Sequence, residues 1–207
     1  MRCAIRLLLP LCILLLAGCA ITSGRSPEQR HYVLTLPQEA APAMTSAEVT
    51  GPRIGVGPVT LPGYLDRPQI FIRQPGAADV QLSEFDRWGE RLQDGVSRLL
   101  TDSLSARLAA HGGMALPLQA GIGGDRRISV NISRFDGAPG SEVLLEAVWS
   151  LTNWNGKALR EGRFVSSVKT GNGIEALVLA HGELIATLSK KLSEEILTEW
   201  QKTGRAR

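Results

Sequence analysis

The stretch ISVNISRFDGAPGSEVLLEAVWSL, residues 128–151, alternates apolar with polar residues in two runs. In the first run isoleucine and valine alternate with serine and asparagine. In the second run apolar side chains occupy every other position from Val143 to Leu151. A period of two is typical of strands with one buried face. A third extended run at 158–170 follows a turn at 153–156, so we predict an antiparallel meander of three strands.

On both sides of this meander the hydrophobic period changes to that of a helix. Residues 90–111 place leucines and Val96 at helical spacing, and Gly112-Gly113 ends the pattern. A second helix is predicted over 174–202. Its apolar stripe consists of Ile174, Leu177, Val178, Leu184, Ile185, Leu188, Leu192, Ile196 and Trp200.

Shorter extended runs precede the first helix. We predict strands at 31–36, 54–59, 70–73 and 79–83, separated by segments rich in proline and glycine. The resulting order of strands, helix, strands and helix is typical of an α+β domain. We therefore predict a single α+β domain over residues 31–204, with a mainly antiparallel sheet and two amphipathic helices packed on one of its faces.

The N-terminal residues have the anatomy of a secretory signal peptide. Arg2 and Arg6 provide a positive start, an apolar run follows at 7–16, and small residues come just before Cys19. The run is too short for a membrane-spanning helix. We predict that residues 1–18 are the signal peptide.

The ending Leu-Ala-Gly-Cys resembles the bacterial lipobox. This resemblance implies cleavage after Gly18, a diacylglyceryl group on the Cys19 sulfur, and an acyl chain such as palmitate on the new amine. Residues 19–30 then form the lipidated N-terminus and a small, polar, turn-rich tether. In Gram-negative bacteria an aspartate after the cysteine usually means inner-membrane retention. Ala20 and Ile21 stand there instead, so we expect the outer membrane, on its periplasmic face.

Cysteine content and net charge limit the classes of protein to which this chain can belong. Of three cysteines, Cys3 and Cys12 lie in the predicted signal peptide, so the mature chain keeps only Cys19 and forms no internal disulfide. The formal net charge is +3, and two of the positive residues are the signal-peptide arginines. The mature chain is therefore close to neutral, and nucleic-acid binding is not expected.

The stretch VTLPGYLDRPQI, residues 59–70, presents Tyr64, Leu65, Asp66 and Arg67 between two predicted strands. Two prolines and a glycine stiffen the backbone here. A rigid loop with an aromatic residue and an arginine suits a protein contact. Alternatively, Tyr64 covers a core edge while Asp66 and Arg67 pair locally. The residues alone leave both interpretations open.

Enzymatic sites find no support in the motifs. The histidines at 31, 111 and 181 are scattered and lack metal-ligand spacing. No nucleophile, base and orienting group can be assembled, and the glycines around 55–57 do not lead into a dinucleotide-binding helix. The run GIGGDRR at 121–127 is read as a loop rather than a phosphate-binding nest. We therefore expect no catalysis, no metal and no cofactor apart from the covalent lipid on Cys19.

Several blocks together resemble the PqiC-type family of ABC-transport auxiliary lipoproteins. These are the lipobox, HYVLTL at 31–36, IGVGPVTLPGYLDRPQIFIR, FDRWGERL leading into the first helix, and RFDGAPGSEVLLEAVWSL. The resemblance spans essentially the whole mature chain. Gly89 and Arg91 depart from the expected pattern at the helix start.

The resemblance implies a non-enzymatic outer-membrane component of an intermembrane lipid transport system. Its expected partner is an MCE-domain protein that spans the periplasm, and a ring of identical subunits is a further implication. A scaffold lipoprotein of outer-membrane protein or lipopolysaccharide assembly would share the same anchor and size. A solute-binding lipoprotein would need two α/β lobes, which the predicted order of elements does not provide.

Overall fold

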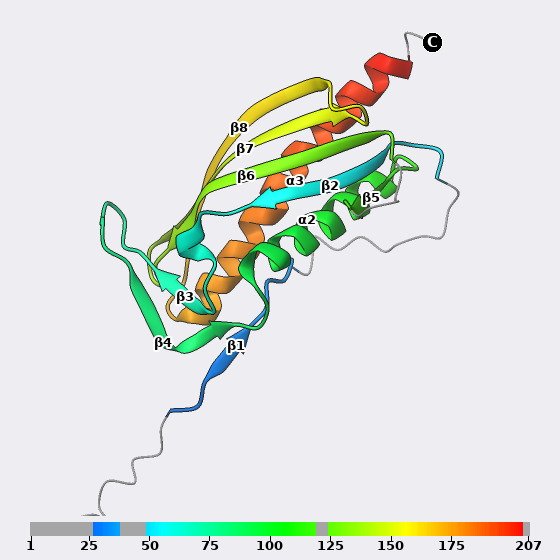
Figure 1. Ribbon diagram of the computed structural model, residues 1–207. Helices are drawn as coiled ribbons and strands as arrows, with labels where there is room; N and C mark the ends of the chain where they lie inside the picture. The colour runs from blue at the N-terminus through cyan, green and yellow to red at the C-terminus, as the bar shows by residue number, and fades with distance from the viewer. Residues whose placement is uncertain (1–26, 38–48, 119–123, 205–207) are drawn as a thin grey trace, which may run out of the picture.

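The structure is a computed structural model that describes residues 27–37, 49–118 and 124–204. The predicted signal peptide, the lipidation site Cys19 and most of the predicted tether lie outside the described residues. The rest forms two sheets and two long helices (Figure 1). The α+β prediction is confirmed.

The larger sheet has five strands in the order β5-β2-β6-β7-β8. Their bounds are β2 (Arg53–Thr60), β5 (Met114–Pro117), β6 (Arg126–Gly137), β7 (Glu142–Asn153) and β8 (Ala158–Lys169). The predicted antiparallel meander is β6-β7-β8. However, β2 runs parallel to both of its neighbours, β5 and β6. The sheet is thus mixed, whereas a mainly antiparallel sheet was predicted.

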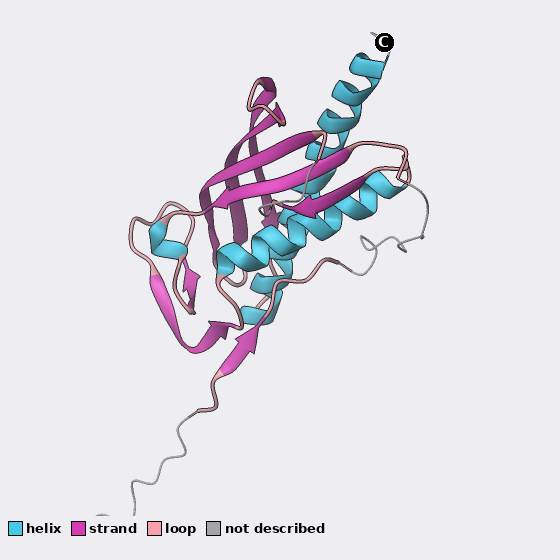
Figure 2. Ribbon diagram, turned by 45° about the vertical axis from the view of Figure 1, so that its right-hand side comes forward, coloured by secondary structure: helices cyan, strands magenta, loops and turns pink. Residues whose placement is uncertain are grey.

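The helices α2 (Leu92–Ala109) and α3 (Ile174–Gly204) lie on the same face of this sheet, as Figure 2 shows. The meander residues that alternate inward, including Ile128, Val143 and Leu151, are fully buried against them. Leu100 of α2 and Leu184 of α3 are likewise completely buried. The prediction of two amphipathic helices on one sheet face is therefore confirmed.

The end of α2 follows the predicted glycines. Gly112 has a φ of +67°, a conformation that favours glycine, and the Gly113 amide donates to the Leu108 carbonyl at 3.0 Å. A side chain at Gly112 would also meet the Thr50 hydroxyl at 2.5 Å. The glycine pair therefore stops the helix and lets the chain turn into β5.

The smaller sheet has three strands in the order β1-β4-β3. They are β1 (Arg30–Tyr32), β3 (Gln69–Ile72) and β4 (Gln81–Trp88), and the short 3-10 helix η3 (Gly63–Leu65) precedes β3. β1 is parallel to β4, and β3 is antiparallel to it. Sequence patterns predicted only a short strand at 79–83 in the β4 region. In the structure the strand continues through Trp88.

A register shift between Ile132 and Arg134 interrupts the alternation of β6. Before the shift, Ile128, Val130 and Ile132 face the helices. After it Phe135 faces them, and the ring centroids of Phe135 and His181 on α3 are 4.6 Å apart. Asp136 consequently points to the opposite face, toward η3 and β3. This single extra residue creates the buried carboxylate described next.

Candidate partner-binding surface

The segment of residues 64–67, singled out in the sequence, lies on and just after η3. Pro62 starts the turn, and its carbonyl accepts a hydrogen bond from the Leu65 amide at 2.9 Å. The Leu65 side chain is only 2% exposed and belongs to the main hydrophobic core. Leu65 therefore fixes the segment to the domain and is not itself available to a partner.

Tyr64 is held by both its ring and its hydroxyl. The ring packs edge-on against Phe71, with 5.7 Å between centroids, and the hydroxyl donates to Asp136 Oδ2 at 2.8 Å. Partial burial, together with this bond to a carboxylate, raises the pKa of Tyr64 to about 12. Of the two interpretations from sequence, covering a core edge describes Tyr64 better than presentation on the surface.

Asp136 is the centre of a polar cluster that sequence patterns did not identify. Its carboxylate is buried, and it accepts a bond from Arg134 Nε at 3.0 Å. Arg73 Nη1 lies 3.5 Å from its other oxygen, where Tyr64 also donates. We call Tyr64, Arg73, Arg134 and Asp136 the Asp136 cluster. It ties the segment to β6, 72 residues away in sequence.

The remaining two residues of the segment are exposed. Asp66 accepts hydrogen bonds from the Arg91 guanidinium at the start of α2, the shorter at 2.8 Å. The hydrogen bond to Asp66 raises the pKa of Arg91. Asp66 thus pairs with Arg91 rather than with its neighbour Arg67, whose side chain is exposed. Asp66 and Arg67 are the part of the segment that a partner can reach.

These two residues border a hollow of about 360 Å³. Its other walls are Pro68 and the stretch from Trp88 to Arg91. The Gly89 amide donates to the Tyr32 carbonyl at 2.7 Å, which places the hollow beside β1. We call it the Asp66 hollow. It combines both signs of charge with apolar walls, as protein contacts commonly do.

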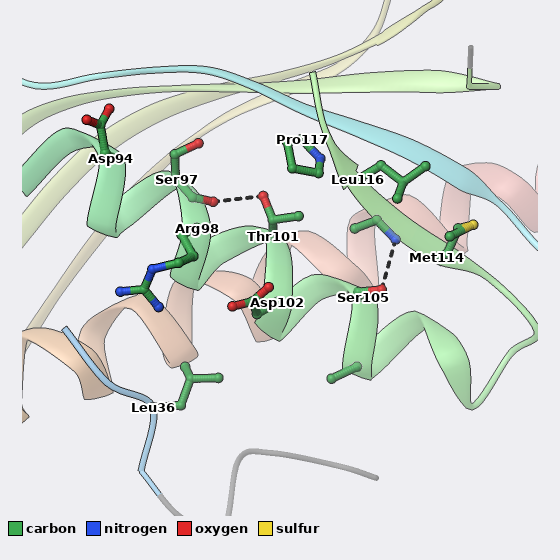
Figure 3. Close-up of a pocket in the computed structure, with 12 residues that line it drawn as sticks. Leu36, Asp94, Ser97, Arg98, Thr101, Asp102, Ser105, Met114, Leu116 and Pro117 are labelled. Carbon is green, nitrogen blue, oxygen red and sulfur yellow. Dashed lines mark hydrogen bonds between the residues drawn. The ribbon is translucent and has the colours of Figure 1, made fainter. Parts of the chain in front are cut away.

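A second concavity lies between α2 and β5 (Figure 3), with a volume of about 630 Å³. Two of its hydroxyls are engaged internally. Thr101 donates to the Ser97 carbonyl at 2.7 Å, and Ser105 accepts from the Ala115 amide at 3.3 Å. Six of its twelve lining residues are apolar, with Leu36 on one side and Leu116 on the other, and most of the surface that they expose to the groove is apolar. The groove therefore offers packing surface rather than a chemically specific site.

His181 is the best buried of the histidines. It packs edge-on against Trp88 and Phe135, and its Nδ1 lies 2.7 Å from the Leu177 carbonyl oxygen one turn earlier. Burial lowers the pKa of His181. No group of three His, Cys, Asp or Glu within the described ranges is placed to hold a metal ion. His181 is thus a packed core residue.

Within the same ranges, no helix is long and apolar enough to cross a membrane. The lipidation site Cys19 lies outside them, and of the predicted tether the structure describes residues 27–30, the last of which, Arg30, begins β1. The candidate site residues divide into half-buried Tyr64, buried Leu65, and exposed Asp66 and Arg67.

Comparison with known proteins identifies both family and fold. The model of a family described as ABC-type transport auxiliary lipoprotein component matches residues 32–193. A crystal structure of an uncharacterized protein superposes with a TM-score of 0.67 at 19% identity, covering 82% of this chain and 99% of the other. A Xanthomonas campestris protein of family DUF330 gives a TM-score of 0.65 at 14% identity, covering 84% and 98%. No curated protein matches the chain.

Proposed function

Because the chain belongs to the family of ABC-type transport auxiliary lipoprotein components, we propose that it serves an MCE/ABC-type intermembrane lipid transport system at the outer membrane. In this role it is a non-enzymatic component that docks a periplasm-spanning MCE protein and supports membrane integrity. The family match over residues 32–193 is the observation that carries the proposal.

The lipid anchor is the first part of this proposal. Diacylglyceryl and acyl chains on Cys19 bind the chain to the outer membrane, because several acyl chains together make anchoring effectively permanent. A Cys19→Ser variant is expected to lose palmitate labelling and to leave the outer-membrane fraction. Retention of the variant in that fraction, with unchanged labelling, would contradict the assignment.

The Asp66 hollow is the proposed docking surface for the MCE protein. It is beside β1, where the domain joins the predicted tether, so a partner bound there lies close to the anchored membrane. Arg67 offers an exposed guanidinium, and arginine is enriched in protein interfaces. The Asp136 cluster holds this surface in place without taking part in the contact.

Photo-crosslinking in cells tests the partner. A photoreactive residue in place of Arg67 is expected to capture an MCE-domain protein, identified by mass spectrometry. The same residue in place of Lys190, an exposed position on α3, is the control. Capture of an outer-membrane assembly barrel at position 67 would instead favour the scaffold function. Capture of neither class would overturn docking through this hollow.

Self-association into a ring is the remaining part of the proposal, and the family resemblance is its support. Crosslinking of full-length protein in membranes, followed by mass determination, should yield a closed set of identical subunits. A strictly monomeric product at every crosslinker concentration would rule the ring out.

A further inference from the structure

Arg126 and Arg127 open β6 and place a guanidinium on each face of the larger sheet, because neighbouring side chains in a strand point oppositely. The Arg126 guanidinium lies 5.0 Å from the Trp200 ring centroid, on the helix-covered face, and donates to Thr203. The Arg127 guanidinium lies 5.2 Å from the Trp154 ring centroid. The larger sheet therefore ends in two arginine–tryptophan stacks.

Arg127 differs from most arginines of the smaller-sheet end in what balances its charge. There, Arg73 and Arg134 meet Asp136, and Arg91 meets Asp66. Within the described part of the chain, no carboxylate lies within ion-pair distance of Arg127, and its Nε is buried without an acceptor. An aromatic face holds a guanidinium while leaving its other donors free. Arg127 thus retains the capacity to bind a carboxylate.

The sheet face that carries Arg127 is the one without helices. Ser129, Asn131 and Ser150 continue along it and line a hollow of about 630 Å³, which also includes Glu161. Arg127 lies outside this hollow, toward the turn between β7 and β8. Val148 and Val165 stand out from this face, 53% and 52% exposed. In Figure 1 no described helix or strand lies over β7 and β8 on this side. We call this surface, from Trp154 to Val165, the open sheet face.

The open sheet face begins at the end of the molecule away from β1. The helix α3 runs from the smaller-sheet end to this end, and its 31 residues extend about 46 Å. His181 near its start contacts Trp88 of β4, whereas Trp200 near its end contacts Arg126 (Figure 1). The end with the two stacks is therefore remote from both the Asp66 hollow and the predicted tether.

We infer that the open sheet face is a second docking surface, which binds a carboxylate-bearing segment of a partner protein with its acidic group at Arg127. This inference rests on the proposed docking function. The charge of Arg127 and of Lys157 in the adjacent turn complements a carboxylate, and arginine and tryptophan dominate protein interfaces. The Asn131 amide can bond an extended backbone, whereas Ser129 Oγ donates to the Ser150 carbonyl at 3.5 Å and Ser150 Oγ donates to Glu161 Oε1 at 3.3 Å. Remoteness from the tether favours a protein over the anchored membrane.

The test places a photoreactive residue at Val148 of the full-length lipoprotein in cells, with Leu179 on α3 as control. The two positions are matched in exposure, at 53% and 52%. Crosslinked peptides are then mapped by mass spectrometry. We expect capture at position 148, but not at 179, of a segment rich in aspartate and glutamate. Arg127→Glu should lower the yield about tenfold, because like charges then face each other.

The charge-reversal Lys190→Glu on α3 controls for nonspecific charge effects and should leave the yield unchanged. A phospholipid adduct, a second copy of this chain, a segment without acidic residues, or no adduct at position 148 would each overturn the inference. The Arg67 position separates this result from the proposed function. Capture of an MCE protein at position 67, with nothing captured at position 148, would overturn the open sheet face as a docking surface but leave the proposed function standing.

Discussion

The two ends of this molecule share one hydrophobic core but differ in the polar contacts that supplement it. The five-stranded sheet and its helices share a continuous aliphatic core, in which Leu100, Leu104 and Leu184 are fully buried. The smaller sheet and η3 join the same core through Leu65, Ile70 and Trp88. They are held in addition by carboxylates: Asp136 binds a tyrosine and two arginines, and Asp86 meets Arg30 at 2.9 Å. The first kind of contact is nondirectional and depends on area, whereas the second depends on placement of single atoms.

The two kinds of contact therefore have different roles: one stabilises the fold, and the other positions the exposed residues of the candidate site. A hydrophobic core tolerates exchange of one apolar side chain for another of similar volume. A carboxylate with three donors fixes the position of the segment that carries them. The domain therefore uses its core for stability and the Asp136 cluster for orienting the exposed residues Asp66 and Arg67. The following predictions test that division, in order of decreasing effect.

Leu184→Ala should destabilise the domain most. Removing a fully buried leucine costs about 3 kcal/mol in the free energy of unfolding, from lost transfer energy and the cavity left behind. Leu179→Ala on the same helix, 52% exposed, should cost less than about 0.5 kcal/mol. Urea denaturation followed by circular dichroism measures both. Equal losses would show that α3 does not carry the core as described.

Asp136→Asn tests whether the polar cluster contributes to stability as well as orientation. The substitution keeps the shape but leaves Arg73 and Arg134 without a carboxylate, at a cost of about 2 kcal/mol because both arginines are partly exposed to solvent. Partner capture at position 67 should fall by a larger factor than after Leu184→Ala, compared at conditions where both variants are folded. If partner capture at position 67 were unchanged, the Asp136 cluster would not be what orients Asp66 and Arg67.

Acid should weaken the hydrophobic core through His181. Burial lowers the pKa of His181 in the folded state. Below about pH 6.5 the imidazole is therefore protonated in the unfolded chain while it is still neutral in the folded chain. The free energy of unfolding should therefore fall as the pH drops, by up to about 1.4 kcal/mol per pH unit from this group. His181→Gln should remove that part of the slope. An identical slope in the variant would assign the acid sensitivity to other groups.

Alkali should weaken the Asp136 cluster through Tyr64. Its pKa is raised to about 12, so the stability that depends on its neutral hydroxyl is complete below about pH 10 and lost as the pH rises toward 12. Tyr64→Phe should cost about 1 kcal/mol at neutral pH and remove this loss. Ultraviolet difference titration should show one phenol fewer ionising late, with Tyr32 as the remaining signal. A late transition that persists in the variant would contradict the assignment.

Separating Asp66 from Arg91 should have the smallest effect on stability. Both side chains are substantially exposed, and ion pairs in water contribute little. A double-mutant cycle with Asp66→Ala and Arg91→Ala should give no coupling beyond measurement scatter, while partner capture at position 67 decreases. A large coupling energy would show that the Asp66–Arg91 pair contributes to the stability of the domain.

Hydrophobic periodicity predicted the elements that have one apolar face. The strands β6, β7 and β8 and both helices alternate in a way that is visible in the sequence, and their bounds are close to those predicted. The parallel placement of β2 was not predictable in this way. Residues 54–57 are all buried, because Ile54 and Val56 belong to the core while Leu118 and Trp154 cover Gly55 on the other face. The pattern of a strand covered on both faces does not show in which direction its neighbours run.

The candidate site was predicted in part. Proline, glycine and the exposed charges of residues 64–67 marked a segment of unusual character. What Tyr64 does there depends on Asp136, which reaches it only because of the register shift after Ile132. A contact across 72 residues, created by one extra residue in a strand, leaves no periodic signal in a single sequence. Two of the blocks that carry the family resemblance meet at this contact.

The strand β1 has a mechanical consequence. In β1, Arg30, His31 and Tyr32 pair with β4, and the described residues 27–29 lead into the strand from its N-terminal side. Tension applied from that side acts along β1, so its bonds to β4 are sheared together rather than opened one by one. A pull strong enough to break them would release three residues while the helix-backed sheet stays folded. Detachment of β1 would then lengthen the segment between the point of pulling and the domain before the domain itself unfolds.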